Sequence, residues 1–288
     1  MMTMTITPSF AVLLTCFNRK AHTLACLEKL YAQTADLSRM AVYLVDDGST
    51  DGTAQAVATA FPKVKLLQGS GALYWNRGMH LAFATAASTG YDYYLWLNDD
   101  TYLYPTALQD LLATHQGLTK KETILVGSTQ DATSGELTYG GYRRSSRWHP
   151  FRYHLLEPSP SNPLPCDTMC GNCVLIPREV VAKIGIINPD YHHRWGDVDY
   201  GLRARRIGCS LLVAPGYVGA CSFNPQSNIW ENRSLPVAAR LKAVNTIKGL
   251  HKRDWKRYTR QFGGFFWIFF WLSPYARILA TSLLPGKK

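Results

Sequence analysis

The sequence contains neither of the two glycine-rich phosphate-binding loops that are commonest in nucleotide-binding proteins. None of its 288 residues form G-x-G-x-x-G after a strand, and none form G-x-x-x-x-G-K-[ST]. The first absence argues against hydride transfer with a dinucleotide cofactor. The second argues against ATP hydrolysis at a P-loop. The sequence also has no internal repeats.

The features of a secreted protein are missing as well. The seven cysteines are odd in number and scattered, so they form no recognisable disulfide framework. Residues 1–8 are short and carry no charged side chain, which does not match a secretory signal. We therefore expect a cytoplasmic location. The spacing of Cys166, Cys170 and Cys173 resembles half of a zinc cluster, but no second pair follows, so we do not expect structural zinc.

Acidic residues are nearly absent from the C-terminal part of the chain. Residues 240–288 hold 11 of the 31 lysines and arginines, but only one of the 20 acidic residues, Asp254. The formal net charge of +11 therefore comes almost entirely from this segment. Because the rest of the chain is close to neutral, we expect no nucleic-acid partner.

The hydrophobic content of 47% suits one large α/β domain with an appended segment. In the first half, apolar runs that end in polar residues predict strands over 10–15, 41–46, 64–67 and 93–97. Helical spacing between them predicts helices over 19–33, from a cap at 49–51 to about 61, and over 76–88. This alternation predicts parallel βαβ units.

The second half is less regular. We expect strands over 123–128, 137–142, 174–176 and 210–214, and helices over 178–184 and from 196 onward. Residues 144–165 form a long loop that suits a lid or a binding surface. Four arginines flank this loop and either grip a diphosphate or simply face solvent: Arg143, Arg144, Arg147 and Arg152.

The strand over 93–97 runs directly into Asn98, Asp99 and Asp100. Two adjacent carboxylates repel each other unless a positive charge lies nearby. Hard cations such as Mg²⁺ or Mn²⁺ prefer carboxylate oxygens and are often shared with a diphosphate. This pattern therefore suggests a cation site at the carboxyl edge of the sheet, where open α/β sheets bind their ligands. The alternative is an ordinary polar turn.

Four pieces in this order resemble glycosyltransferase family 2, whose members are inverting enzymes of the GT-A fold. They are T-C-F-N-R at 15–19, V-D-D-G-S-T-D-G-T at 45–53, N-D-D at 98–100 and G-D-V-D at 196–199. The resemblance covers about residues 8–222, and the chain looks like the bacterial members that build O-antigen or capsule. It implies an α/β fold with a Rossmann-like nucleotide-binding half and a mixed sheet.

The resemblance also implies which residues hold the donor. Thr15 and Asp47 match positions that contact the base, where a carboxylate can accept the imide N–H of uracil or thymine. Asp99 matches a contact to the ribose or the diphosphate. The complete implied donor set is Thr15, Asn18, Arg19, Asp47, Asn76 and Asp99.

For the metal and the base, the resemblance points to two acids. Asp100 matches the ligand of a Mn²⁺ or Mg²⁺ ion, and Asn98 is a second candidate ligand at a position where many members have an acid. Asp197 matches the catalytic base, and Gly196 replaces the glutamate that usually precedes it. Asp199 is the alternative base, at a position the family more often uses structurally.

Two interpretations remain open for several neighbouring residues. We expect Asp46 and Asp51 to brace the turn rather than to touch a ligand. His192 and His193 either line an acceptor pocket or, as we expect, belong to a surface loop. Trp75 either stacks on a sugar or base or packs within the protein.

The C-terminal segment is basic and aromatic. Apolar spacing predicts one amphipathic helix over 241–262, and an aromatic run over 265–272 follows it. Pro274 and Arg277 argue against a simple membrane span, so we expect amphipathic helices that associate with the anionic inner leaflet. The alternative is a helix that packs on the catalytic domain or on a dimer partner.

We therefore predict a catalytic domain over 1–235, divided into a nucleotide-sugar half (8–120) and an acceptor half (121–235), followed by a membrane-association segment (236–288). The predicted activity is metal-dependent, inverting transfer of a hexose or deoxyhexose from a UDP- or dTDP-sugar to a lipid-linked saccharide. The predicted place is the inner face of the cell membrane. The alternatives are a sugar nucleotidyltransferase, which would need a glycine-rich loop that 15–19 lacks, and a non-enzymatic basic module that binds membrane or nucleic acid.

Overall fold

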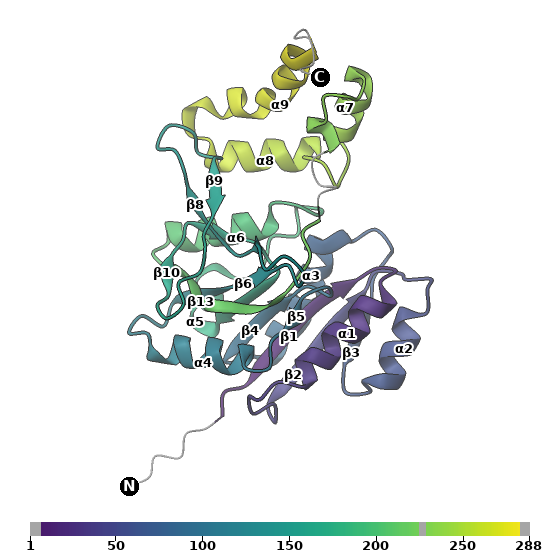
Figure 1. The fold of residues 1–288 in the computed structure, drawn as a ribbon, viewed down its shortest axis with the longest axis vertical. Coiled ribbons are helices and arrows are strands. Elements are labelled where there is room, and N and C mark those ends of the chain that lie inside the picture. Colours follow the sequence, from purple (N-terminus) through teal and green to yellow (C-terminus); the bar gives the residue numbers. More distant parts are fainter. Residues whose placement is uncertain (1–6, 225–228, 283–288) are drawn as a thin grey trace.

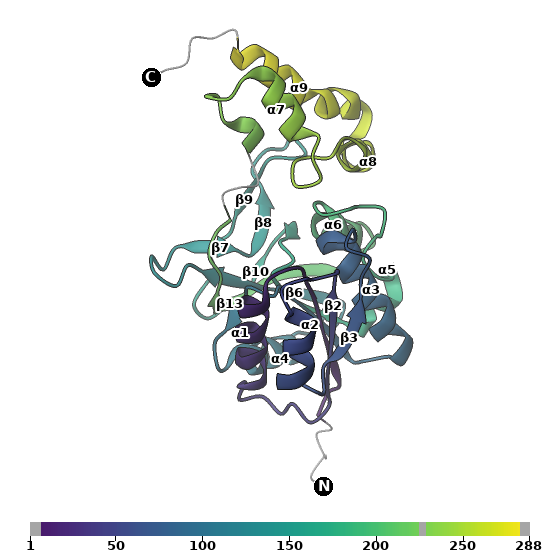
Figure 2. The ribbon, with the colours of Figure 1, turned by 90° about the vertical axis from the view of Figure 1, so that its right-hand side faces the viewer.

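The computed structural model describes residues 7–224 and 229–282. An α/β body forms one part of the molecule, and a group of C-terminal helices packs at the end away from the N-terminus (Figures 1 and 2). The body contains a ten-stranded mixed sheet in the order β10-β13-β6-β12-β4-β1-β2-β3, with β5 and β7 paired at its side. A second, three-stranded sheet has the order β11-β8-β9.

The four strands predicted for the first half are all confirmed. They are β1 (Phe10–Cys16), β2 (Met40–Asp46), β3 (Lys65–Gln68) and β4 (Tyr93–Leu97), and they run parallel. The helices between them are also present as α1 (Lys20–Tyr31), α2 (Thr53–Ala60) and α3 (Tyr74–Thr89). The carboxyl ends of these strands therefore share one edge of the sheet, as the βαβ pattern requires.

Alternate residues of the strands build two separate cores. Leu13 of β1 packs in the core that α3 covers, whereas Val12 and Leu14 pack in the core that α1 covers. A strand buried on both faces needs apolar residues at every position, which explains the uninterrupted apolar runs in the sequence. The second core is closed by α4 (Ala107–Gly117), a helix that the sequence pattern did not reveal.

The second half joins the first through an antiparallel strand. β12 (Cys173–Pro177) lies between β4 and β6 (Thr123–Gln130) and runs antiparallel to both. β13 (Ser210–Ala220) pairs in parallel with β6, and it pairs antiparallel with the short strands β5 (Tyr102–Leu103) and β10 (Leu164–Pro165). The sheet is therefore mixed, and β12 brings the second half directly beside the acid-bearing end of β4.

Two expectations about the second half need correction. The single strand expected over 137–142 is two strands, β7 (Leu137–Tyr139) and β8 (Gly141–Arg144), in different sheets. The expected loop over 144–165 contains β9 (Tyr153–Leu155), which pairs with β8, while β8 also pairs with β11 (Thr168–Met169). Long-range pairing, which no local pattern reports, decides both cases. The helices α5 (Arg178–Ile184) and α6 (Gly196–Arg206) lie as predicted.

The prediction of a single amphipathic helix over 241–262 is wrong. The chain forms α7 (Val237–Val244), turns, and then forms α8 (Lys252–Phe262), the 3₁₀ turn η2 (Gly264–Phe266) and α9 (Trp267–Ser282). The turn is closed by backbone hydrogen bonds from Gly249 to Thr246 and from Leu250 to Val244. A Cβ on Gly249 would lie 2.3 Å from the carbonyl oxygen of Ala243, so this turn requires a glycine.

The apolar face of α8 packs on the α/β body. Tyr258 stacks on Trp195 with ring centroids 4.7 Å apart, and Trp255 meets Phe151 edge-on at 5.4 Å. These rings belong to a third core that joins the body to the C-terminal helices. The alternative of packing on the catalytic body is therefore correct for α8. Among the described residues, no helix combines the length and the hydropathy needed to cross a membrane.

Candidate active site

A cavity of about 560 Å³ opens where the carboxyl end of β4 meets the amino end of α6. Arg19, Asp99 and Asp100 line it from the first half, and Asp197 lines it from the second half. Trp255 and Tyr258 of α8 complete the wall. Three segments far apart in the sequence therefore build one site, and the first two are the segments that the sequence motifs single out.

Arg19 partly offsets the negative charge of the paired acids. Its Nη2 lies 2.7 Å from Oδ2 of Asp100, and its Nη1 lies 3.6 Å from Oδ1 of Asp99. Burial raises the pKa of Asp99 to about 7, because the positive charge of Arg19 only partly offsets desolvation and Asp100 adds repulsion. The protein itself thus supplies part of the positive charge that the two carboxylates need.

The residues at the end of β4 fit a hard cation with one clear protein ligand. Asp100 is partly exposed and lines the cavity, so its carboxylate is open to an ion shared with a diphosphate. Asn98 is less available, because its Oδ1 accepts a hydrogen bond from Trp75 Nε1 at 2.6 Å. Trp75 therefore orients Asn98, and its ring packs edge-on against Trp96 with ring centroids 6.1 Å apart. Packing within the protein is confirmed; Trp75 also lines the cavity, and its stacking on a sugar or base stays a prediction.

The two residues that the resemblance assigns to the nucleotide base, Asp47 and Thr15, make mainly structural contacts. The carboxylate of Asp47 accepts backbone N–H groups of Gly71, Leu73 and Tyr74 at 2.8–2.9 Å. Thr15 packs so tightly on α3 that a Cβ on Gly78 would lie 2.3 Å from its Oγ1. Asp47 and Thr15 therefore have defined structural partners at the carboxyl ends of the strands. The resemblance places the nucleotide base beside the same strand ends.

Asn18 and the two expected turn-bracing acids also bind backbone groups. Asn18 Oδ1 accepts the backbone N–H of Thr50 at 2.7 Å and so ties the loop after β1 to the loop after β2. Asp46 accepts the N–H of Ser49, and Asp51 accepts those of Lys20 and Thr53. The interpretation of Asp46 and Asp51 as turn-bracing residues is confirmed.

The position of Asn76 does not support the expectation that it contacts the donor. Its side chain is completely buried, and its Nδ2 donates to the carbonyl oxygens of Asn188 and Tyr191 at 2.7 and 2.8 Å. Asn76 therefore positions the loop before α6, and it is not among the residues that line the cavity. The same packing accounts for Gly196, since a Cβ there would lie 1.5 Å from Asn76 Oδ1.

Of the two acids on α6, only Asp197 lines the cavity. Its Oδ2 accepts the backbone N–H of Gly171 at 3.0 Å, and burial raises its pKa. Asp199 is fully buried, lies 2.7 Å from Arg203 Nε and also accepts a hydrogen bond from Gln261 at 2.9 Å. Asp199 therefore holds the helix in place, and Asp197 is the acid available as a base.

Aromatic rings form a large part of the rest of the cavity wall. They come from both halves of the body and from α8: Trp75, Tyr139, Tyr142, Phe151, Tyr153, Trp195, Phe223, Trp255 and Tyr258. Sequence reasoning missed the contribution of α8, because it assigned that apolar face to a membrane. A spacing pattern shows that a face is apolar but not what covers it.

His193 and Arg194 also line the cavity, whereas His192 does not. Burial, together with the positive charges of Arg194 and Lys248, lowers the pKa of His193 to about 4. His193 is therefore neutral near pH 7. The four arginines around 144–165 lie outside this cavity; Arg143, for example, donates to the carbonyl oxygen of Pro165 at 2.6 Å.

The sequence and the fold both match known glycosyltransferases. The model of the family described as "Glycosyl transferase family 2" matches residues 11–185. An N-acetylglucosaminyl-diphospho-decaprenol L-rhamnosyltransferase of Mycobacterium tuberculosis is 25% identical over 202 residues. That match covers 61% of this chain and 64% of the length of the relative.

Solved structures of similar fold have low sequence identity. A mannosyltransferase from Pyrobaculum calidifontis, solved in complex with GDP-Man and Mn²⁺, gives a TM-score of 0.57 at 16% identity. The match covers 99% of this chain and 77% of the mannosyltransferase chain. A fragment of S. aureus TarS in complex with UDP gives a TM-score of 0.55 at 16% identity. This match covers 91% of this chain and 74% of the TarS chain. These likenesses show a GT-A type of α/β fold.

Proposed function

This chain belongs to glycosyl transferase family 2, and we propose that it transfers a sugar from a UDP- or dTDP-sugar to a lipid-linked saccharide during synthesis of a bacterial surface glycan. The observation that carries the proposal is the shared cavity, which Asp197 lines together with the ion pair of Arg19 and Asp100. The name of the mycobacterial relative, which describes a rhamnosyltransferase for a decaprenol-linked sugar, supports a lipid-linked acceptor.

The proposed reaction is a direct displacement with inversion. An acceptor hydroxyl gives its proton to the carboxylate of Asp197 and attacks the anomeric carbon, while the bond from that carbon to the diphosphate oxygen breaks. The bonding electrons leave with the nucleoside diphosphate. Arg19 lies beside Asp100 and is placed to stabilise the charge that develops on this leaving group. A Mn²⁺ or Mg²⁺ ion at Asp100 would supply further neutralisation of the diphosphate.

The aromatic wall of the cavity suits a saccharide acceptor. Trp195, Trp255 and Tyr258 line the cavity and pack on one another, and Trp195 lies two residues before Asp197. Two of the three come from α8. Aromatic rings offer large apolar faces with a polar edge, a combination that also suits the alternating polar and apolar surface of a sugar. We therefore assign this side of the cavity to the acceptor and the Arg19 side to the donor diphosphate.

The proposed place of action is the anionic inner surface of the cell membrane. Exposed apolar side chains gather on η2 and α9, where Phe265 is 92% exposed and Phe269 is 70% exposed. The preceding helix α8 carries exposed basic residues: Lys252, Arg253, Lys256, Arg257 and Arg260. Apolar rings next to basic groups are the combination that binds an anionic interface.

Membership of the family favours glycosyl transfer over the two alternatives. A sugar nucleotidyltransferase would not require a base in the cavity that holds the diphosphate, whereas Asp197 lines the same cavity as Arg19 and Asp100. A purely basic binding module would not require a cavity lined by Asp197 and the paired acids.

A donor screen followed by a transfer assay tests the proposal. The full chain is mixed with UDP, dTDP, GDP and their sugars, each with and without Mn²⁺, and its melting temperature is measured. We expect a UDP or dTDP compound to stabilise the protein by mass action. The stabilising sugar is then offered with a polyprenyl-diphosphate-linked saccharide, and product formation is followed. Failure of every nucleotide sugar to stabilise the protein or to give product would contradict the proposal.

Chelation tests the metal requirement separately. EDTA should stop transfer, and added Mn²⁺ or Mg²⁺ should restore it. Asp100→Asn should lose this response, while Asp110→Asn, which changes an exposed acid on α4, should keep it. Full activity in EDTA would remove the proposed role of Asp100.

A further inference from the structure

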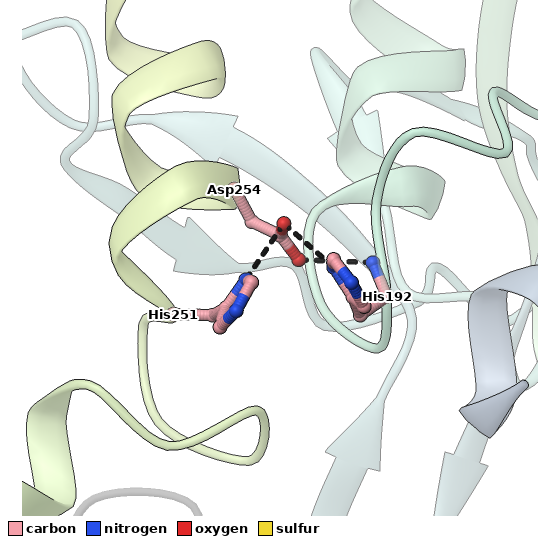
Figure 3. Close-up of side chains that lie close together, drawn as sticks. All are labelled: His192, His251 and Asp254. Carbon is pink, nitrogen blue, oxygen red and sulfur yellow. Dashed lines mark hydrogen bonds and ion pairs between the residues drawn. The ribbon is translucent and has the colours of Figure 1, made fainter. Parts of the chain in front are cut away.

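Three potential metal ligands converge outside the cavity, where the loop before α6 meets the start of α8 (Figure 3). Nδ1 of His192 lies 2.9 Å from Oδ1 of Asp254, and Nδ1 of His251 lies 2.8 Å from the same oxygen. One ligand atom from each of the three residues lies within 4.8 Å of the others. Among the described residues, this is the one group of three or more His, Cys, Asp or Glu side chains with such geometry.

Asp254 needs a positive partner that the protein's strong bases do not provide. Its side chain is only 2% exposed, and a buried carboxylate is costly unless it is paired or bound to a metal. Within 7–224 and 229–282, its ion-pair partners are the two histidines, and no lysine or arginine pairs with it. A metal ion between the three ligands would supply the missing charge.

The backbone is arranged to keep the ligands together. His251 has φ 50° and ψ 109°, an unfavourable conformation for a residue other than glycine. This conformation directly precedes α8 and places His251 beside Asp254 in the first turn. The backbone N–H of His192 donates to Oδ2 of Asp254 at 2.9 Å, which fixes the carboxylate and leaves Oδ1 toward the imidazoles.

We propose that His192, His251 and Asp254 bind a divalent transition-metal ion, with Zn²⁺ the best match. Two imidazole nitrogens and one carboxylate oxygen suit Zn²⁺, which takes such ligands in a tetrahedral arrangement. Each histidine side chain is 20% exposed, so water can reach the site and fill the fourth position. This site is separate from the cation position at Asp100, which offers oxygen ligands only.

The ion would join the two segments that build the acceptor side of the cavity. His192 precedes Asp197 by five residues, and Asp254 immediately precedes Trp255. An ion bound to both segments therefore fixes α8 against the loop that leads into α6. Its role is structural, and it does not depend on which sugar or acceptor the protein uses.

Metal binding by the full chain tests this proposal. Chelator-treated protein is titrated with Zn²⁺ by calorimetry, and a second sample is titrated with Co²⁺ while visible d–d absorption is recorded. We expect one Zn²⁺ site and the intense Co²⁺ bands typical of four-coordinate nitrogen and oxygen ligation. The same site should remain in Asp100→Asn, because that change removes only the proposed donor-side ion.

Single changes of the histidines assign the site. His192→Gln and His251→Gln should each weaken Zn²⁺ binding at least tenfold, whereas His154→Gln, a change of an exposed histidine on β9, should not. Circular dichroism checks that each variant is folded. Wild-type affinity in both cluster variants would overturn the proposal. So would an absence of Co²⁺ bands in the wild-type protein, or loss of all Zn²⁺ binding in Asp100→Asn.

Discussion

Arg19 Nη2 lies 2.7 Å from Asp100 Oδ2, so an arginine that follows β1 directly contacts an acid that follows β4. The two strands are parallel neighbours in the mixed sheet, and their carboxyl ends share one edge. The pair places a fixed positive charge beside the proposed metal ligand. Arg19 therefore serves two purposes in the proposed function: it stabilises the acids in the absence of donor and faces the diphosphate in its presence.

The first prediction concerns this pair. Arg19→Gln should lower the free energy of unfolding by about 1 kcal/mol, a modest amount because Arg19 is 38% exposed. Mn²⁺ should then raise the melting temperature of the variant more than that of the wild type, because the ion replaces the lost positive charge. Arg178→Gln, which breaks the exposed pair with Asp92, is the matched control. Equal Mn²⁺ responses in all three proteins would refute the argument.

Replacement of the proposed base separates binding from chemistry. Asp197→Asn should lower kcat by roughly 10²–10⁴-fold, because the acceptor hydroxyl loses its proton acceptor. Donor affinity, measured by the melting-temperature shift, should stay unchanged. Since burial raises the pKa of Asp197, the acidic limb of the wild-type pH–rate profile should lie above the ordinary aspartate value of 3.8. Turnover near the wild-type rate in Asp197→Asn would assign the base to another group.

The glycine before this base should be irreplaceable. Gly196→Ala places a Cβ 1.5 Å from Asn76 Oδ1, so Asn76 or the start of α6 must move. We expect a loss of about 1–3 kcal/mol of stability together with a loss of transfer activity. Gly117→Ala meets no atom within 4 Å and should leave stability unchanged or slightly raised. Chemical denaturation of the two variants compares them, and equal stability would contradict the packing argument.

Acidification should destabilise the protein through His193. Its pKa is lowered to about 4 in the folded state and is near 6.5 when unfolded, so the unfolded chain takes up a proton first as pH falls. The stability that His193 contributes is therefore complete above about pH 6.5 and is lost toward pH 4.

Urea denaturation at about pH 5 and about pH 7.5 measures this contribution. The wild type should lose more stability on acidification than His193→Gln does. His154→Gln serves as the exposed control and should behave like the wild type. If His193→Gln lost as much stability as the wild type, the lowered pKa would not contribute.

The exposed rings of η2 and α9 should bind an anionic lipid surface. Replacement of both Phe265 and Phe269 by serine should weaken binding to anionic vesicles by roughly tenfold or more, because each ring loses its apolar transfer energy. Sedimentation with vesicles measures this. Ile207→Ser changes an exposed apolar residue on the body and should have no effect. Equal sedimentation of the double variant and the wild type would point to a protein partner for this surface.

Local sequence determined the first half of the fold and the position of its acids. β1, β2 and β4 have apolar runs because both of their faces are largely buried, and polar residues follow where each strand leaves the core. Parallel strands share their carboxyl edge, which explains why Arg19, after β1, lies near Asp99 and Asp100, after β4. The four motifs at 15–19, 45–53, 98–100 and 196–199, in this order, were sufficient to identify the family.

Tertiary structure decided what each polar side chain contacts and what covers each apolar face. Asn76 resembled a donor ligand in the sequence, but long-range packing buries it against the loop before α6. The apolar face of α8 had the spacing of a membrane helix, yet Trp195 and Phe151 cover it. A sequence pattern reports that a side chain avoids water or makes hydrogen bonds, because these are properties of the residue. The partner is set by segments distant in the chain, and only the folded protein brings His192, His251 and Asp254 together.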